Sequence, residues 1–362
     1  MTSEVLEMFG KAPGARMLAT GLIALGLSLS GCSTDDAEPV DGDPKGETPR
    51  DTHDHVEVQP IVPNDTALSA IWGSSANNVW AVGANGTIMH YDGKELALID
   101  SGVDVPLLAV HGTGPDDVWF VGELGVTLHW DGTQVSLHVQ VEDETLLGVW
   151  ANAPDDVWAV GSYPKPAGGR IGMMRHWDGQ RWEELNIPPA TSLWELWSTG
   201  PDNVWAVGTS TDASGIVVHG EGNVVTQVEF DGQPLRGVWG VASDDVWVLP
   251  YDSPLQHWDG NSFTPSEASS EKPMLGMWGS SPDDVWAVGL EGRILHYDGD
   301  AWETANSVTD VTLWSVWGSH AEDVWIAGGA GTLLRWDGED WRKLEVATTP
   351  VITSAEASSD TE

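Results

Sequence analysis

One short stretch decides the fold, and over residues 277–299 it reads MWG, then a turn with Pro and Asp, then VWAVGLEGRILHYDG. Short runs rich in Val, Ile, Leu, Trp and Tyr alternate in it with Gly, Pro and Asp. Such runs are typical of short β-strands, and the residues between them favour tight turns. The stretch therefore predicts consecutive strands joined by short turns, with no helix between them.

The same pattern recurs seven times between residues 68 and 347. The first aromatic position is spaced by 39, 39, 47, 42, 39 and 39 residues, at Trp72, His111, Trp150, Trp197, Trp239, Trp278 and Trp317. The second is always Trp, at Trp80, Trp119, Trp158, Trp205, Trp247, Trp286 and Trp325. In the second repeat we expect strands over 107–112, 118–122, 126–130 and 134–139.

A period near 40 with four short strands in each unit is typical of propeller blades. The sequence predicts an all-β fold, a seven-bladed β-propeller of four-stranded antiparallel blades. The last unit keeps its own fourth strand, over 341–347, so the ring can close without strand exchange. A strand over residues 56–62 is the alternative latch.

The motifs VWAVG at 285–289 and GRILHYDG at 292–299 resemble the propellers of the photosystem II assembly factor family, and more broadly the BNR/Asp-box repeats. The resemblance covers residues 68–347 and implies a propeller, with a role in assembling a complex as one expectation. The Asp-box turn is degenerate, since Trp follows the Gly by three residues only at Trp182, Trp302 and Trp341.

The N-terminus resembles a bacterial lipoprotein signal peptide. Lys11 and Arg16 precede an apolar stretch too short to span a bilayer, which runs into Leu29-Ser30-Gly31-Cys32. The resemblance implies cleavage before Cys32 and its lipidation, and Cys32 is the only cysteine of the chain. Because Glu4 and Glu7 do not suit such a signal, we expect translation to start at Met8.

These features predict four segments. Residues 1–31 form the signal peptide, and 32–67 carry the lipidated Cys32 and an acidic tether too polar to order itself. Residues 68–347 form the propeller, and 348–362 a disordered tail. Ser33 after the Cys favours the outer membrane or cell surface, so the membrane is one predicted partner through the lipid.

The charge balance excludes one class of partner. The chain has 15 Lys and Arg against 56 Asp and Glu, a formal net charge of −41. Nucleic acid binding needs clustered cations that neutralise phosphates, so no nucleic acid partner is expected.

The repeated Trp, His and Asp residues invite sugar or metal sites, but their positions favour structural roles. Six His share one position, and Arg335 takes it in the seventh repeat; the six are His90, His129, His176, His219, His257 and His296. Equivalent positions on different blades lie too far apart to share one zinc ion. We expect these His to bond a neighbouring Asp, and the Asp pairs before Val-Trp to close turns. No metal or cofactor is expected.

Enzyme activity is a weaker hypothesis. Sialidases of the superfamily use three arginines, a Tyr with a Glu, and an Asp, whereas residues 68–347 hold only seven Arg. No such constellation is evident, so we expect no enzyme, with a sialidase-like glycan hydrolase as the alternative.

A binding site is expected where the repeat is broken. The third and fourth repeats carry insertions at 162–169 and 209–215, and the connection 186–192 is long. Second-to-third-strand loops and blade connections open on one face. We therefore predict a recognition surface there, with candidate residues Tyr163, Lys165, Arg170, Arg175, Arg181 and Asp212.

The function predicted from the sequence is thus a membrane-anchored, non-catalytic binding or assembly scaffold at the cell envelope. It would present a monomeric propeller to a protein or a polysaccharide.

Overall fold

A computed structural model describes residues 66–266 and 272–344. The chain divides into two units, residues 1–55 and residues 56–362. The first unit lies outside the described residues, as do the predicted signal peptide, Cys32, nearly all of the tether, the alternative strand 56–62 and the tail.

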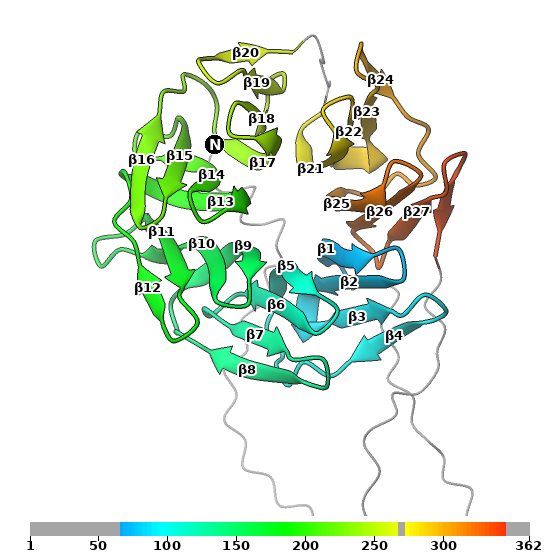
Figure 1. The fold of residues 1–362 in the computed structure, drawn as a ribbon, viewed down its shortest axis with the longest axis horizontal. Helices are drawn as coiled ribbons and strands as arrows, with labels where there is room; N and C mark the ends of the chain where they lie inside the picture. Colours follow the sequence, from blue (N-terminus) through cyan, green and yellow to red (C-terminus); the bar gives the residue numbers. More distant parts are fainter. Residues whose placement is uncertain (1–65, 267–271, 345–362) are drawn as a thin grey trace, which may run out of the picture. The chain divides into compact units, whose positions relative to one another are not determined.

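The described residues confirm the predicted fold class. Seven separate sheets each contain four antiparallel strands in chain order (Figure 1). The first three blades have these strands: β1 (Leu68–Ser75), β2 (Asn78–Gly83), β3 (Ile88–Tyr91) and β4 (Leu96–Ile99); β5 (Leu107–Gly114), β6 (Asp117–Gly122), β7 (Thr127–Trp130) and β8 (Val135–Val139); β9 (Thr145–Ala153), β10 (Asp156–Pro164), β11 (Arg170–Trp177) and β12 (Trp182–Glu184).

The remaining four blades follow the same order. Their strands are β13 (Ala190–Gly200), β14 (Asn203–Ser210), β15 (Gly215–Glu221) and β16 (Val224–Val228); β17 (Leu235–Ala242), β18 (Asp245–Pro250), β19 (Gln256–Trp258) and β20 (Phe263–Pro265); β21 (Met274–Ser281), β22 (Asp284–Gly289), β23 (Ile294–Tyr297) and β24 (Trp302–Thr304); β25 (Leu313–His320), β26 (Asp323–Gly328), β27 (Leu333–Trp336) and β28 (Trp341–Lys343).

Two 3-10 turns, η1 (Ala84–Gly86) and η2 (Leu290–Gly292), are the helical elements within these bounds. In the described part of the chain, no helix is long and apolar enough to cross a membrane. The first strands β1, β5, β9, β13, β17, β21 and β25 surround the centre of the ring, and the fourth strands lie at its outside (Figure 1).

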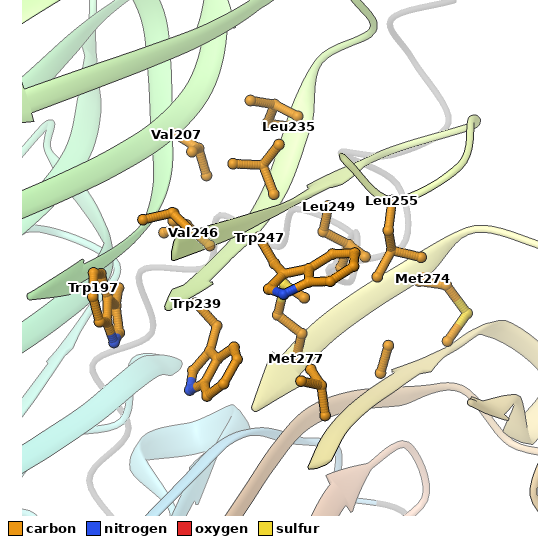
Figure 2. Packing of buried hydrophobic residues seen from close by; sticks show 14 of the residues in the cluster. Trp197, Val207, Leu235, Trp239, Val246, Trp247, Leu249, Leu255, Met274 and Met277 are labelled. Atoms are coloured by element: carbon orange, nitrogen blue, oxygen red, sulfur yellow. The ribbon is translucent and has the colours of Figure 1, made fainter. Parts of the chain in front are cut away.

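The second strands form the core, which is why their motif is the most regular. Trp80, Trp158 and Trp325 have no exposed surface, and the four equivalent Trp are at most 7% exposed. Each of these strands also buries apolar residues against both neighbouring blades, as in the cluster around Trp239, Trp247 and Met277 (Figure 2). The predicted structural role of this Trp position is confirmed.

The Trp-Gly motif of the first strands joins neighbouring blades. The indole of Trp72 lies over Gly112 of the next blade, where a built Cβ would be 2.8 Å from the ring. The same contact joins Trp197 to Gly240, Trp239 to Gly279, Trp278 to Gly318 and, across the closing seam, Trp317 to Gly73. Glycine is required there because any side chain would meet the ring.

A polar network fixes each blade from inside. In the second blade, Asp117 accepts hydrogen bonds from Trp119 Nε1 at 3.1 Å and Thr113 Oγ1 at 2.5 Å, and His129 Nε2 lies 2.7 Å from its Oδ1. His129 also stacks near the indole of Trp119, with ring centroids 4.3 Å apart. The predicted His–Asp bond is confirmed for His129, His176, His257 and His296. His90 and His219 instead contact Asn78 and Asn203 at the equivalent position.

The prediction for the Asp pairs is wrong for their second member. Asp156, for example, accepts a hydrogen bond from Trp158 Nε1 and lies 2.8 Å from His176 Nε2, rather than accepting from backbone amides of the turn. The turns between third and fourth strands are instead closed by the Asp of the Asp-Gly motif. Asp131 Oδ1, for example, accepts from the backbone N–H groups of Thr133 and Gln134.

The ring closes through side chains. Strand β1 packs on β25 and β26. The closing seam buries Leu68 and Ile71 of the first blade with Trp325 and Leu333 of the seventh. Each described blade takes all its four strands from one continuous segment, and β28 is supplied by the last repeat itself. In the described residues, the ring therefore closes without strand exchange.

Antiparallel order gives every blade two distinct ends. One end carries the turns between second and third strands and the connections between blades, and we call this side of the ring the connection face. The other end carries the first-to-second and third-to-fourth turns, and we call it the turn face. The candidate residues do not all lie on the same face.

Candidate functional site

The two predicted insertions lengthen β-hairpins on the connection face of the third and fourth blades. In the third blade, β10 and β11 pair as far as Pro164 and Arg170. In the fourth, β14 and β15 pair as far as Thr209 and Gly215. Only residues 165–169 and 211–214 remain as turns, so the inserted residues are mostly strand and project as ordered arms.

Each arm is anchored at its base. A Cβ at Gly172 of β11 would lie 2.8 Å from the Cβ of Ala190, the first residue of β13. Gly215 of β15 lies against the ring of Phe230 and donates its N–H to the Gly232 carbonyl at 2.9 Å. These contacts place the two arms side by side along the third, fourth and fifth blades.

The arm tips carry two of the predicted residues. Lys165, half-buried, donates its N–H to the Gly169 carbonyl at 2.9 Å. The exposed Asp212 accepts hydrogen bonds from the Ser210 and Ser214 hydroxyls and the Ser214 N–H, and these bonds lower its pKa to about 2. Asp212 therefore shapes its own turn while its charge faces solvent.

Two predicted arginines are engaged inside the protein. The Arg170 guanidinium donates to Ser162 Oγ and the Ser162 carbonyl, both at 2.7 Å, and to Thr145 Oγ1 at 3.0 Å. Arg175 forms an ion pair with Glu144 at 2.5 Å, and both side chains are at most 14% exposed. Tyr163 is half-buried on β10 and packs against the core between the second and third blades. These three side chains mainly support the arms.

Arg181 does not join the predicted surface. It lies in the turn between β11 and β12, which belongs to the turn face, and its guanidinium pairs with Glu183. Its side chain is 72% exposed. The prediction grouped it with Lys165 because the two are close in sequence, but the eight residues of β11 carry the chain to the opposite end of the blade.

Sequence reasoning missed a second group of residues close to the centre of the ring, on β13 and β17. The first strands share a β-bulge at the residue after their leading buried Leu or Met, which turns that side chain out of the regular alternation. In the fourth and fifth blades the bulge residues are Trp194 and Arg236. The equivalent residues elsewhere are Ser69, Leu108, Leu147, Leu275 and Trp314.

Trp194 and Arg236 stack on one another. The Arg236 Cζ lies 3.6 Å from the centre of the Trp194 ring and 5.3 Å from that of Tyr251, which follows β18. Tyr251 is placed by its N–H, which donates to the Pro234 carbonyl at 2.9 Å. We call these three residues the arginine cluster. It lies toward the connection face, because Tyr251 begins a second-to-third-strand turn.

Glu195, next to Trp194, is the other departure from the repeat. The six equivalent positions hold Ala70, Ala109, Gly148, Gly237, Gly276 and Ser315. Burial raises the pKa of Glu195 to about 8, although a hydrogen bond from the Val238 N–H lowers it in part. Ser315 accepts the equivalent bond from the Ile71 N–H at 3.2 Å. Glu195 thus bridges two blades as a mostly neutral acid at pH 7.

His111 marks a third departure, at the seam of the second and third blades. It replaces the Trp of the Trp-Gly motif, and Ala151 replaces the Gly that such a Trp would cover. His111 Nδ1 accepts the Ala151 N–H at 3.0 Å, and its ring stacks 4.0 Å from Trp150. Burial lowers the pKa of His111 to about 3, so this ring is neutral at pH 7.

The missed residues had a detectable signal. When the seven first strands are aligned from their leading Leu or Met, Glu195 and Arg236 are the two charged residues among the leading three positions. Aligning the repeats does not reveal that Trp194, Arg236 and Tyr251 are in contact, because that contact joins two blades.

Among the described residues, no three His, Cys, Asp or Glu side chains converge as metal ligands. The groups that gather on the connection face are a guanidinium, aromatic rings and the two arms. Such groups can bind an anionic or polypeptide ligand by stacking, hydrogen bonding and charge.

Comparisons with known proteins identify the fold. No protein-family model matches the chain, and no curated protein matches it. Among solved structures, YCF48 from Cyanidioschyzon merolae is similar with a TM-score of 0.60 and 16% identity, covering 78% of this chain and 98% of that one. A structure described as YCF48 bound to D1 peptide has a TM-score of 0.55 and 18% identity, over 77% and 95% of the two chains.

A second kind of propeller is equally similar. The WD40 β-propeller domain of Doa1 has a TM-score of 0.61 and 11% identity, covering 75% of this chain and 92% of that chain. At these identities the likeness establishes the architecture alone. The chain is a seven-bladed propeller built like YCF48 and WD40 domains.

Proposed function

We propose that the protein is a non-catalytic binding scaffold that holds a protein partner on the connection face of its third, fourth and fifth blades. One observation carries the proposal: both long arms and the two charged residues near the start of the first strands gather there. Both long arms, Trp194, Glu195 and Arg236 all lie in these three blades. A residue that only stabilises a blade has no reason to differ from its six equivalents.

A protein partner is favoured over a polysaccharide. A propeller of the same architecture has been solved as YCF48 bound to D1 peptide. Propellers of the WD40 kind, such as the domain of Doa1, share the ring as well. The two arms add ordered strand edges and the exposed Asp212, which suit polypeptide contacts.

We further propose that a lipid on Cys32 anchors the scaffold at the outer membrane or cell surface. Support comes from Leu29-Ser30-Gly31-Cys32 after an apolar stretch, and from the polar segment that follows. Two or three acyl chains would hold the protein stably on a membrane. A Cys32→Ala variant should move from the membrane fraction to the soluble fraction and lose incorporation of a labelled fatty acid. A variant that stays labelled would contradict the anchor.

The partner surface is tested by photo-crosslinking on intact cells. A photoreactive residue is placed at Ala167 or Asp212 on the arms, and at Gln180 as the matched control on the turn face of the same blade. All three positions are exposed. We expect a discrete crosslinked protein from the arms and none from the control, and mass spectrometry then identifies it.

A second variant tests whether the arms are needed to bind the partner. Residues 162–170 and 209–215 are replaced by the short turn of the second blade, residues 122–126. The control replaces the turn 289–293 of the sixth blade, which has ordinary length. Loss of the crosslinked partner in the first variant alone supports the proposal, and retention of every partner in both would overturn it.

A further inference from the structure

Arg236 is held in an unusual environment for a charged side chain. The Trp194 ring covers the guanidinium at 3.6 Å, and Tyr251 flanks it at 5.3 Å. Stacking of this kind is favourable and fixes the plane of the guanidinium. Burial lowers the pKa of Arg236 to about 10, which still leaves it charged at neutral pH.

This charge has no acceptor within residues 66–266 and 272–344. No hydrogen bond or ion pair to the guanidinium is found there, and Nε is shielded from solvent without a partner. The indole Nε1 of Trp194 is shielded and unpartnered as well. Glu195 does not serve, because its carboxyl group accepts the Val238 N–H and no ion pair joins it to Arg236 among the described residues. Buried charges in proteins are normally paired, so an unpaired one needs a reason.

The same chain contains a completed version of this arrangement. Arg335 lies over the ring of Trp325 at 4.8 Å and near that of Tyr91 at 5.8 Å. Its Nε donates a hydrogen bond to Asp323 Oδ1 at 2.7 Å. Both arginines therefore have a Trp face and a Tyr face, and they differ in the carboxylate that only Arg335 possesses.

We propose that the arginine cluster is a binding site for one carboxylate group of a ligand, which occupies at Arg236 the place that Asp323 takes at Arg335. The ligand reaches it from solvent, because Trp194, Arg236 and Tyr251 all keep partial exposure. A planar, singly charged carboxylate matches the donors of one guanidinium. A carboxylate is favoured over phosphate because the group that occupies the equivalent place at Arg335 is the carboxylate of Asp323.

The arginine cluster lies toward the connection face, as the arms do, so this inference deepens the proposed function and rests on it, but acid binding at Arg236 is measured without the partner. The carboxylate can belong to a free organic acid or to an acidic side chain of a polypeptide. The chemistry at Arg236 is the same for both sources, and the test separates them.

The test is isothermal titration calorimetry on the purified full chain at constant ionic strength. The probes are succinate, with succinamide as its uncharged control, and an amidated peptide with one Glu, with the Gln peptide as its control. We expect an acid to bind in a 1:1 ratio while its amide does not. Arg236→Lys should weaken binding about tenfold or more, because Lys lacks the planar fork.

The matched control is Arg293→Gln. Arg293 also has a solvent-shielded Nε without a partner, but no aromatic ring covers it among the described residues. Binding should survive Arg293→Gln and disappear in Arg236→Gln, with melting temperatures showing that both variants fold. If Arg236→Gln does not fold, Arg236→Lys decides alone.

The outcomes separate the possibilities. Binding of succinate identifies a small acid as sufficient, and binding of the Glu peptide alone identifies a polypeptide source. If neither acid binds better than its amide, or if an acid binds the Arg236 variants as tightly as the original chain, the proposal is wrong. The arm-exchange variant keeps Arg236 and should still bind the acid, so a failure of the proposed function is seen independently.

Discussion

Asp117 and its equivalents are the residues that tie each second strand to its third. One carboxylate accepts from an indole, an imidazole and a hydroxyl, so its removal leaves several polar groups without a partner. We predict that Asp117→Ala lowers the free energy of unfolding by about 2–4 kcal/mol. Urea unfolding followed by tryptophan fluorescence measures this.

The repeat supplies the controls for Asp117. Asn203 occupies the equivalent position and accepts from Trp205 Nε1 at 2.8 Å while donating to Thr199 at 2.7 Å. Asp117→Asn should therefore cost within about 1 kcal/mol, and Asp116→Ala, at an exposed position, about 0.5 kcal/mol or less. An Asn variant as unstable as the Ala variant would show that charge, rather than hydrogen bonding, is what matters.

Glu195 makes the stability of the ring depend on pH. Burial raises its pKa from 4.5 to about 8, so between these values the folded chain binds a proton more tightly than the unfolded chain. The contribution of Glu195 to stability is therefore full below pH 4.5 and falls as pH rises through 8. Glu195→Gln should raise the free energy of unfolding at pH 8.5 by on the order of a few kcal/mol, at about 1.4 kcal/mol for each pKa unit.

Comparison of two pH values isolates this effect. At pH 4.5 and below, Glu195→Gln should have nearly the stability of the original chain, because the carboxyl is neutral in both states. Glu303→Gln, at an exposed position on β24, should leave the pH dependence unchanged. The prediction is wrong if the original chain and Glu195→Gln lose stability in parallel from pH 5 to 8.5.

At the scale of the strand, the Trp-Gly contacts make neighbouring first strands interdependent. A Cβ at Gly318 would meet the Trp278 ring at 2.5 Å and the Asp323 carbonyl at 2.8 Å. We predict that Gly318→Ala costs about 1–3 kcal/mol by overpacking. At the seam of the second and third blades, the smaller ring of His111 contacts Ala151 instead of a glycine. A smaller ring therefore leaves room for the Cβ at this position.

A double-mutant cycle tests this coupling. Trp278→His should destabilise strongly by itself, since it truncates a large aromatic contact. The double variant Trp278→His, Gly318→Ala should be more stable than the sum of the single effects by about 0.5 kcal/mol or more. Strict additivity, measured by urea unfolding, would mean that the ring does not limit the residue at 318.

The strands were predictable because their pattern is local and is repeated seven times. Strand β7, expected over 126–130, spans Thr127–Trp130, and β8, expected over 134–139, spans Val135–Val139. The core role of the second Trp followed from position alone. The arms were also located correctly, but as loops, because the pairing of Tyr163 with Ile171 depends on register that composition does not reveal.

The site was less predictable, since it depends on contacts between blades. Arg181 was grouped with Lys165 by sequence distance, whereas strand direction separates them. Trp194 belongs to neither repeated Trp position, and its stacking on Arg236 arises only when β13 and β17 lie side by side. The burial of an acid such as Glu195 depends on neighbours remote in the chain, which sequence patterns do not contain.

At the scale of the molecule, closure depends on matching side chains. The seventh blade meets the first through Trp317 over Gly73 and through Ser315, which accepts the Ile71 N–H. The seam therefore uses contacts that also occur at other seams of the ring. Within the described residues, no blade holds a strand borrowed from another. A regular ring of this kind provides a rigid base, on which the irregular third to fifth blades can differ without weakening closure.

Net charge acts on the ring as a whole. The chain carries −41, and folding brings these charges closer together than in the unfolded state. Salt screens this repulsion over a Debye length that shrinks from about 10 Å at 0.1 M to about 3 Å at 1 M. Salt also weakens exposed ion pairs such as Arg342–Asp337. This loss offsets little of the stability gained by screening the repulsion, because each pair contributes about 1 kcal/mol or less.

We therefore predict that the melting temperature rises by several degrees, roughly 3–8 °C, between low salt and about 0.5 M NaCl. Sucrose at equal osmolality controls for effects unrelated to charge. A variant with Asp116→Asn, Glu142→Gln and Glu303→Gln, all at exposed positions, should melt higher at low salt and respond less to NaCl. A melting temperature that stays flat or falls as NaCl is added would mean that local ion pairs outweigh the repulsion, since only those are weakened by screening.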